Sequence, residues 1–125
     1  MEARTVYELV GGRQWFDDLV ARFYDGVAAD PALRPMYPDD LSDSKAHLAG
    51  FLAQYWGGPT TYSDQRGHPR LRMRHAPFAI GAAERDAWLG HMRTAIRAAE
   101  PAPEVESVML EYFANAADHM VNVAP

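Results

Sequence analysis

The stretch FDDLVARFYDGV, residues 16–27, places apolar side chains at intervals of three and four residues. That spacing is typical of an amphipathic helix, because such positions share one face at 3.6 residues per turn. We therefore predict a helix that begins after Gly11 and Gly12. Its apolar face holds Phe16, Leu19, Val20, Phe23, Tyr24 and Val27.

The same periodicity recurs three more times along the chain. A second helix is predicted from near Ser42, a candidate N-cap, to the stop at Gly57-Gly58-Pro59. A third covers about 82–99, and a fourth follows Pro103 with a stripe from Val105 to Met120. Leu48, Phe51, Leu52 and Tyr55 share one face of the second helix. Since no stretch alternates with period two, we predict an all-α fold in a single domain, residues 1–125.

Two segments between these helices are expected to be irregular. Asp30 caps and Pro31 opens a piece of one or two turns that ends at Pro38. Residues 59–72 hold two prolines, a glycine and many charges, and predict a long loop with at most one helical turn near 71–75. Such loops in small helical domains often carry function.

The composition excludes several classes of protein. Without cysteine the chain cannot form disulfides, thiolate zinc sites, iron–sulfur clusters or a thiol nucleophile. Twelve basic against 17 acidic residues give a net charge of -5, which argues against nucleic acid as a partner. No window is apolar enough to span a membrane, and the N-terminal residues lack a secretory signal pattern. We therefore expect no membrane partner and a cytoplasmic location.

His75 is a candidate metal ligand in LRMRHAPF, residues 71–78. A histidine on a short, proline-bounded turn can offer a neutral ring nitrogen to a metal, although a hydrogen-bonded core or surface histidine has the same pattern. Its spacing from His68 is not that of a zinc site. Arginines at 66, 70, 72 and 74 suit a small anionic ligand, or are simply solvated charges.

Three polar aromatic residues on or near the apolar stripes are a second candidate site. Tyr24, Tyr37 and Trp88 each carry a donor that needs a partner when buried. A backbone carbonyl would satisfy each of them. Three such donors in one cavity would instead stabilise a polar diatomic ligand or an anion.

These pieces, taken in order, resemble a known family. They are Phe23-Tyr24, Met36-Tyr37-Pro38, FLAQYWGGP at 51–59, GHPRLRMRHAPF at 67–78, and Trp88. The succession resembles the group II truncated haemoglobins over about residues 5–122. The resemblance implies a shortened globin, a two-over-two helical sandwich around haem b, with the first globin helix nearly absent.

The resemblance also implies roles for single residues. His75 corresponds to the proximal iron ligand, and Tyr24, Tyr37 and Trp88 to the distal ligand-stabilising cage. Ser44 takes the usual distal histidine position, with Leu48 one turn on. The expected haem-binding residues are Arg74, Tyr62 and His47 at the propionates, and Phe51, Phe78, Met73 and Met109 on the haem wall.

The leading functional hypothesis is a haem protein that binds dioxygen and other diatomic ligands, with tight oxygen retention. Such retention suits nitric oxide oxidation or peroxide chemistry, with an unidentified reductant, better than oxygen transport. Nitric oxide, carbon monoxide and peroxide are the other expected ligands. The alternatives are a haem-based oxygen or nitric oxide sensor, a ligand-dependent interaction module without turnover, and a haem-free all-α interaction domain. Homo-oligomer formation stays open.

Overall fold

The computed structural model describes residues 4–68, 70, 75 and 78–123. Its helices are α1 (Val6–Leu9), α2 (Arg13–Ala28), the 3-10 helix η1 (Arg34–Met36), α3 (Ser42–Tyr55), α4 (Thr61–Arg66), α6 (Ala82–Ala98) and α7 (Pro103–Met120). None of the described residues lies in a strand. The all-α prediction is confirmed, and α1 is only a single turn.

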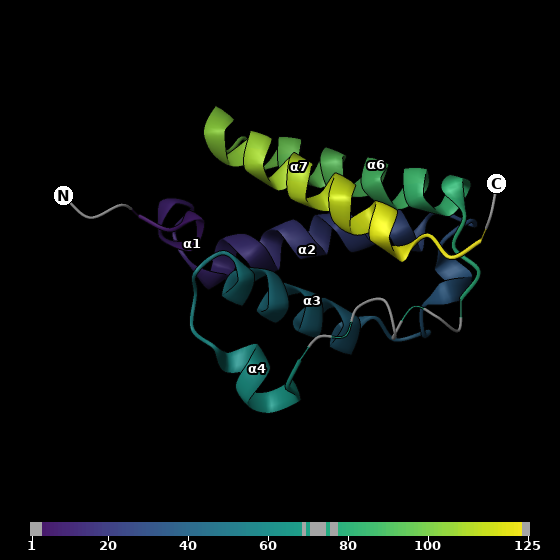
Figure 1. Ribbon diagram of the computed structural model, residues 1–125, viewed down its shortest axis with the longest axis horizontal. Helices are drawn as coiled ribbons and strands as arrows, with labels where there is room; N and C mark the ends of the chain where they lie inside the picture. The colour runs from purple at the N-terminus through teal and green to yellow at the C-terminus, as the bar shows by residue number, and fades with distance from the viewer. Residues whose placement is uncertain (1–3, 69, 71–74, 76–77, 124–125) are drawn as a thin grey trace.

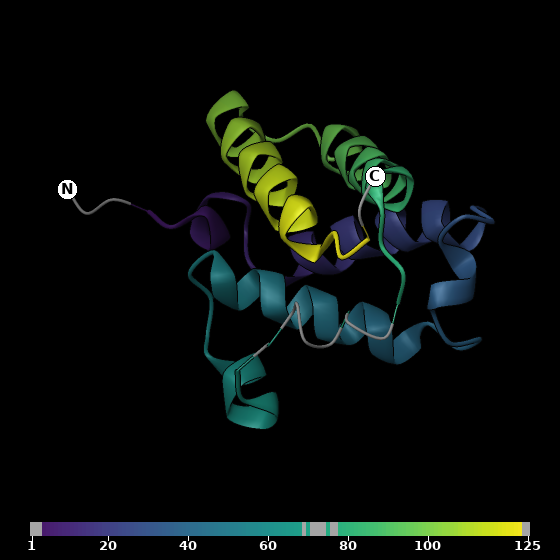
Figure 2. The ribbon, with the colours of Figure 1, turned by 45° about the vertical axis from the view of Figure 1, so that its right-hand side comes forward.

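The long helices form two layers. Figure 1 shows α6 and α7 as one pair and α2 and α3 as the other, and the rotated view in Figure 2 keeps the same grouping. α2 packs against both α3 and α6, so it joins the two pairs. α4 lies below α3 in the view of Figure 1 and contacts it. This is the two-over-two arrangement.

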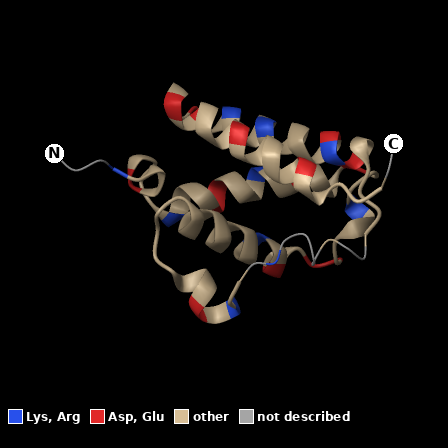
Figure 3. Cartoon of the chain, in the orientation of Figure 1, with Lys and Arg blue, Asp and Glu red and all other residues tan. Residues whose placement is uncertain are grey.

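The core lies where the apolar stripes of these helices meet. All six predicted side chains of the α2 stripe are buried, and they pack against Met92, Ile96, Met109 and Phe113 from the other layer. Burying each large apolar side chain contributes about 1.5–3 kcal/mol, which fixes the stripe toward the core. Figure 3 marks acidic residues in red at the start of α7, where Glu104 and Glu106 complement the helix dipole.

Two predictions about local structure are wrong. The segment 59–72 is not all loop, because Thr61–Arg66 form α4. Gln54 holds this helix from α3, donating to Ser63 Oγ at 2.6 Å and accepting from Ser63 N at 2.9 Å. Ser42 is the first helical residue rather than the N-cap, and its N–H donates to Asp40 at 2.9 Å.

Tyr55 ends the apolar stripe of α3 at the surface. It is the last residue of α3, and the chain turns away at Trp56. Its ring centroid lies 6.2 Å from that of Phe51 on the same helix and 4.3 Å from that of Tyr112 on α7, while 53% of the residue is exposed. The helix period therefore holds to the last residue of α3.

Two helical glycines give opposite expectations for stability. A Cβ at Gly26 would lie 2.5 Å from His91 Nδ1, and His91 Nε2 is held 2.7 Å from Asp30 Oδ2. Gly26→Ala should therefore lower the free energy of unfolding by about 1 kcal/mol, because overpacking outweighs the helix propensity of alanine. Gly90 has no atom within 4 Å of its Cβ position. Gly90→Ala should raise the free energy of unfolding by about 0.5–1 kcal/mol. Urea unfolding of both variants checks this, and equal stabilisation would contradict it.

Candidate functional site

A cavity of about 290 Å³ is lined by side chains from both helix layers and from the segment that precedes α6. α3 contributes one face of its helix, and α7 contributes residues at intervals of one and four along its apolar stripe. Most of the wall is aliphatic or aromatic, which is typical of a pocket that buries an organic ligand. The polar groups on it are few and come from different elements.

The cavity gathers most of the residues that the sequence singled out. On its wall lie Tyr24, Tyr37, His47, Leu48, Phe51, Tyr62, His75, Phe78 and Trp88. Ser44 adjoins this wall through its hydrogen bond to Tyr24. Met109 is fully buried in the core cluster instead of on the cavity wall. Arg74 and Met73 lie outside the described residues.

Tyr24, Tyr37 and Trp88 form one contiguous cluster. The rings of Tyr24 and Tyr37 meet edge to face with centroids 5.5 Å apart. Trp88 is hydrogen-bonded to Tyr37. Because an indole N–H can only donate, the Tyr37 oxygen accepts and keeps its own hydroxyl proton to donate. The three side chains come from α2, the end of η1, and α6, so only the tertiary fold brings them together.

The two phenols of this cluster resist ionisation. Burial raises the pKa of Tyr24 well above its ordinary value, Tyr37 adds to the rise, and the hydrogen bond from Ser44 opposes it. Burial also raises the pKa of Tyr37, against the effect of Trp88. Both hydroxyls therefore stay protonated near neutral pH and remain hydrogen-bond donors.

His75 is half-buried and sits on a segment held by Asn122, which lies just after the end of α7. The Asn122 amide nitrogen donates to the carbonyls of Phe78 at 2.8 Å and His75 at 3.4 Å. Its side-chain oxygen accepts from Ile80 N at 2.8 Å. The backbone N–H of Asn122 donates to Ile80 O at 2.9 Å. The sequence analysis missed Asn122, because nothing local links it to a residue 47 positions away.

His47 on the cavity wall contacts a cation. Its Nε2 lies 3.0 Å from Arg66 Nη1. Since a guanidinium can only donate, the His47 nitrogen is the acceptor in this pairing. Arg66 at the end of α4 and His47 on α3 are thus placed together, while Arg70 is exposed and Arg72 lies outside the described residues.

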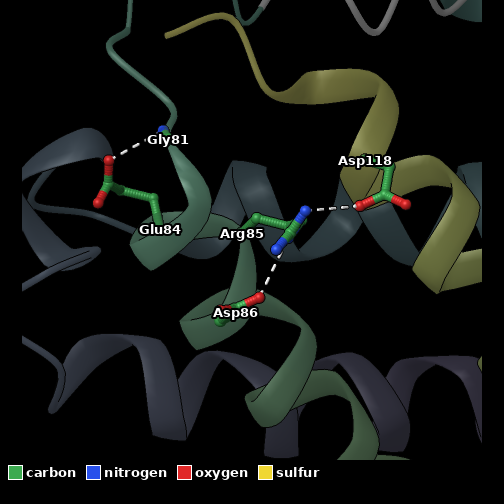
Figure 4. Close-up of polar contacts among 5 residues, drawn as sticks. All are labelled: Gly81, Glu84, Arg85, Asp86 and Asp118. Atoms are coloured by element: carbon green, nitrogen blue, oxygen red, sulfur yellow. Dashed lines mark hydrogen bonds and ion pairs between the residues drawn. The ribbon is translucent and has the colours of Figure 1, made fainter. Parts of the chain in front are cut away.

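Arg85 is a charged wall residue that the sequence analysis missed. Figure 4 shows its guanidinium held between Asp86 at 3.1 Å and Asp118 at 3.0 Å, which ties α6 to α7. The neighbouring Glu84 accepts from Gly81 N at 3.0 Å and closes the first turn of α6. Their positions four and three residues before Trp88 could have indicated them, since i, i+3 and i+4 positions share a helix face.

The sequence analysis did not assign the remaining residues of the cavity wall to a site; it either placed them in the apolar core or did not mention them. They are Leu33, Met36, Leu52, Ile80, Tyr112, Phe113, Ala116, Ala117 and Met120. Several of them belong to the apolar stripe of α7. Periodicity alone does not tell whether an apolar helix face lines a ligand cavity or packs against other side chains.

The chain matches the family model of bacterial-like globins over residues 5–122. It belongs to this globin family. Group 2 truncated hemoglobin YjbI from Bacillus subtilis is 39% identical over 93% of this chain and 87% of its own. The thermostable hemoglobin of Thermobifida fusca is 55% identical, with a TM-score of 0.94 over 98% of this chain and 100% of that one. The group II truncated hemoglobin of Bacillus anthracis is 38% identical, with a TM-score of 0.94 over 98% of this chain and 95% of that one.

The resemblance to group II truncated haemoglobins is thereby confirmed, and with it the class of a haem globin that binds diatomic ligands such as dioxygen. The residues present fit a haem. The cavity is apolar, and His75 on its wall is the kind of imidazole that ligates haem iron. Elsewhere in the described chain, no three His, Asp or Glu side chains converge as metal ligands. No described helix has the length and apolarity needed to cross a bilayer.

Proposed function

We propose that this globin binds haem b through His75 and retains dioxygen for redox turnover rather than for delivery. The observation that carries the proposal is the Tyr24–Tyr37–Trp88 cluster on the wall of the cavity that also contains His75. The B. subtilis truncated haemoglobin of known structure, 38% identical, is named oxygen-avid, which agrees with this proposal.

The three residues of the distal cluster each have a physical role in the proposal. When bound, the haem supplies an iron centre for ligand binding and electron exchange. Tyr37 and Tyr24 keep their hydroxyl protons and can donate to a ligand that carries partial negative charge. Trp88 supplies a donor that cannot be deprotonated at ordinary pH. Hydrogen bonds of about 1–3 kcal/mol each slow the release of such a ligand.

The anionic edge of a haem needs cations or donors. His47 and Tyr62 offer such groups at the cavity wall, and Arg66 stands beside His47. Arg74, next to His75 in sequence, is proposed as a further propionate partner. Phe51 and Phe78 add apolar surface to the cavity wall, against which the flat ring of a haem can pack.

Turnover distinguishes this proposal from a sensor or a ligand-dependent interaction module. The experiment starts from purified protein with about one haem per chain, whose Soret band shifts with dithionite and with carbon monoxide. This protein receives ascorbate and then repeated additions of nitric oxide or hydrogen peroxide. We expect many equivalents per chain to be consumed, with nitrate formed from nitric oxide. Consumption of a single equivalent of each would favour the sensor or the interaction module.

A further inference from the structure

The stretch between α2 and α3 forms part of the cavity wall without a long helix to hold it in place. Residues 30–39 contain only η1, a short 3-10 helix, on the way from α2 to α3 (Figure 2). Leu33, Met36 and Tyr37 of this stretch line the cavity. Because so short a helix has few hydrogen bonds of its own, contacts with the rest of the molecule determine where these three side chains lie.

Helix α6 holds this stretch at both ends. At its start, His91 Nε2 lies 2.7 Å from Asp30 Oδ2. Near its end, Tyr37 is hydrogen-bonded to Trp88. Trp88 and His91 are three residues apart on α6 and therefore share one face of the helix. A single helix face thus fixes both ends of the stretch that carries Tyr37.

The contact between His91 and Asp30 has a defined proton and little freedom to move. The hydrogen bond from His91, and then the one from Ala32 N, hold the pKa of the Asp30 carboxyl below its ordinary value, so this group is a carboxylate that can only accept. His91 Nε2 therefore carries the hydrogen and donates it. The two side chains are 27% and 21% exposed, and a Cβ at Gly26 would lie 2.5 Å from His91 Nδ1. The imidazole is thus enclosed between α2 and Asp30.

A chain of hydrogen bonds connects Asp30 to the backbone of Tyr37. Asp30 Oδ1 accepts from Ala32 N at 2.9 Å, and the Asp30 carbonyl accepts from Arg34 N at 2.9 Å. The Arg34 guanidinium donates in turn to the Tyr37 carbonyl at 3.2 Å and to the next two carbonyls at 3.0 and 2.9 Å. A displacement of Asp30 is therefore transmitted through Arg34 to Tyr37.

We propose that His91, acting through Asp30, is a positioning residue for Tyr37 that keeps the phenol hydroxyl against Trp88 and directed at a ligand in the cavity. His91 itself does not line the cavity, so it acts without touching the ligand. The proposal rests on the function proposed above, because it gives His91 a part in the retention of dioxygen. Without the donor on His91, residues 30–39 are held to α6 at one end only, and the Tyr37 hydroxyl takes up more than one position.

Dioxygen release from the haem-loaded protein tests the hydrogen bond itself. His91→Phe keeps a ring beside Gly26 but removes the donor, whereas His91→Gln keeps an N–H near the position of Nε2. We expect release to become about 3- to 10-fold faster in His91→Phe and to stay near the wild-type rate in His91→Gln. Equal acceleration in both variants would show that the ring matters rather than the hydrogen bond, and would overturn the proposal.

Asp30→Ser provides a second test from the other side of the contact. Serine keeps an acceptor for Ala32 N but is too short to reach His91. Release should again be faster by about 3- to 10-fold, with circular dichroism to verify the helices. The proposal therefore does not depend on the folding of one variant. Release at the wild-type rate in Asp30→Ser would overturn it.

A double-variant cycle with Tyr37→Phe shows whether His91 acts through Tyr37. In the Tyr37→Phe background, His91→Phe should change dioxygen release by less than about twofold. The same acceleration in both backgrounds would overturn the proposal. If Tyr37→Phe alone leaves release unchanged, the donor cluster of the proposed function fails. If Tyr37→Phe accelerates release but His91→Phe and Asp30→Ser do not, only the role of His91 fails.

The infrared spectrum of the carbon monoxide complex gives a readout that does not depend on rates. The C–O stretching band responds to hydrogen-bond donors beside the ligand, so several positions of the Tyr37 hydroxyl should produce several bands. We expect an additional band at higher frequency in His91→Phe, absent from wild type and from His91→Gln. An unchanged spectrum in His91→Phe would overturn the proposal.

Asp17→Asn is the matched control. It weakens an ion pair of similar length, 2.9 Å from Arg13 Nε, and neither residue lines the cavity. The infrared band and the dioxygen release rate should both stay unchanged. A change as large as that in His91→Phe would show that loss of any ion pair loosens the cavity, and would overturn the assignment to His91.

Discussion

Replacing His75 by alanine is expected to strip the haem from an otherwise folded protein. His75 is the histidine that reaches the cavity from the segment before α6, and its imidazole would supply the axial bond to iron. Loss of that bond should weaken haem affinity by about 100-fold or more. The measurement is the Soret absorbance and haem content per chain after purification, with circular dichroism to verify the helices.

Two controls make this result specific. His119→Ala removes an exposed histidine from the last turn of α7 and should keep about one haem per chain. His75→Gly leaves space for free imidazole, so added imidazole should restore the ferrous carbon monoxide spectrum. Full haem content in His75→Ala, with an unchanged spectrum, would show that another residue holds the iron.

The second large effect is expected at Trp88. Trp88→Phe keeps an aromatic ring against Phe23 and Phe113 but removes the indole donor. The single indole N–H donates to Tyr37 in this structure, and we expect it to turn to a bound ligand that carries partial negative charge. Losing that hydrogen bond, about 1.5–3 kcal/mol, corresponds to about 10- to 100-fold faster dioxygen release. Stopped-flow displacement of dioxygen by carbon monoxide measures the rate.

Tyr24→Phe should act in the same direction, by about tenfold. Since Tyr24 packs edge to face on Tyr37 and Trp88 is hydrogen-bonded to Tyr37, the double variant should show less than the product of the single effects. Wild-type release should stay constant from about pH 6 to pH 9, because raised pKa values keep both phenols protonated. A rate that follows a titration in this range would contradict the assigned donors.

Trp15→Phe is the matched control for the indole. Trp15 packs edge to face on Phe16, with centroids 5.2 Å apart, and does not line the cavity. Dioxygen release should be unchanged in it. Carbon monoxide, which gains less charge than dioxygen, should leave Trp88→Phe at nearly the wild-type rate. Equal acceleration for both ligands would point to a wider cavity, and the donor argument would then be wrong.

The long helices could be predicted because their information is local. The stripe from Phe16 to Val27 repeats at the helix period, and burial of each member favours one orientation. α4 could not be predicted in this way, because its six residues are stabilised by Gln54 and by burial of Tyr62 against Phe51. A short helix of this kind depends on contacts that the segment does not itself contain.

The residues of the candidate site also fall into two groups, those that the sequence indicated and those that only the structure showed. Sequence pattern indicated His75, Tyr24, Tyr37 and Trp88 as chemistry-bearing residues, and resemblance supplied the roles that remain predictions. Arg85 was missed although it precedes Trp88 by three residues on the same helix face, because a charged residue there is usually solvated and its partner Asp118 lies on α7. Met109 was predicted at the haem and lies in the core, since an apolar stripe does not say which of its members meets the cavity.

The helix class, the cysteine-free chemistry and the polar aromatic residues available for a ligand all follow from the sequence alone. Other features emerge only in the folded chain: Asn122 holds the His75 segment, Arg66 stands beside His47, and Tyr55 is exposed to solvent. Helix periodicity repeats within a few turns of chain, whereas these contacts join residues that become neighbours only after the two helix layers have packed.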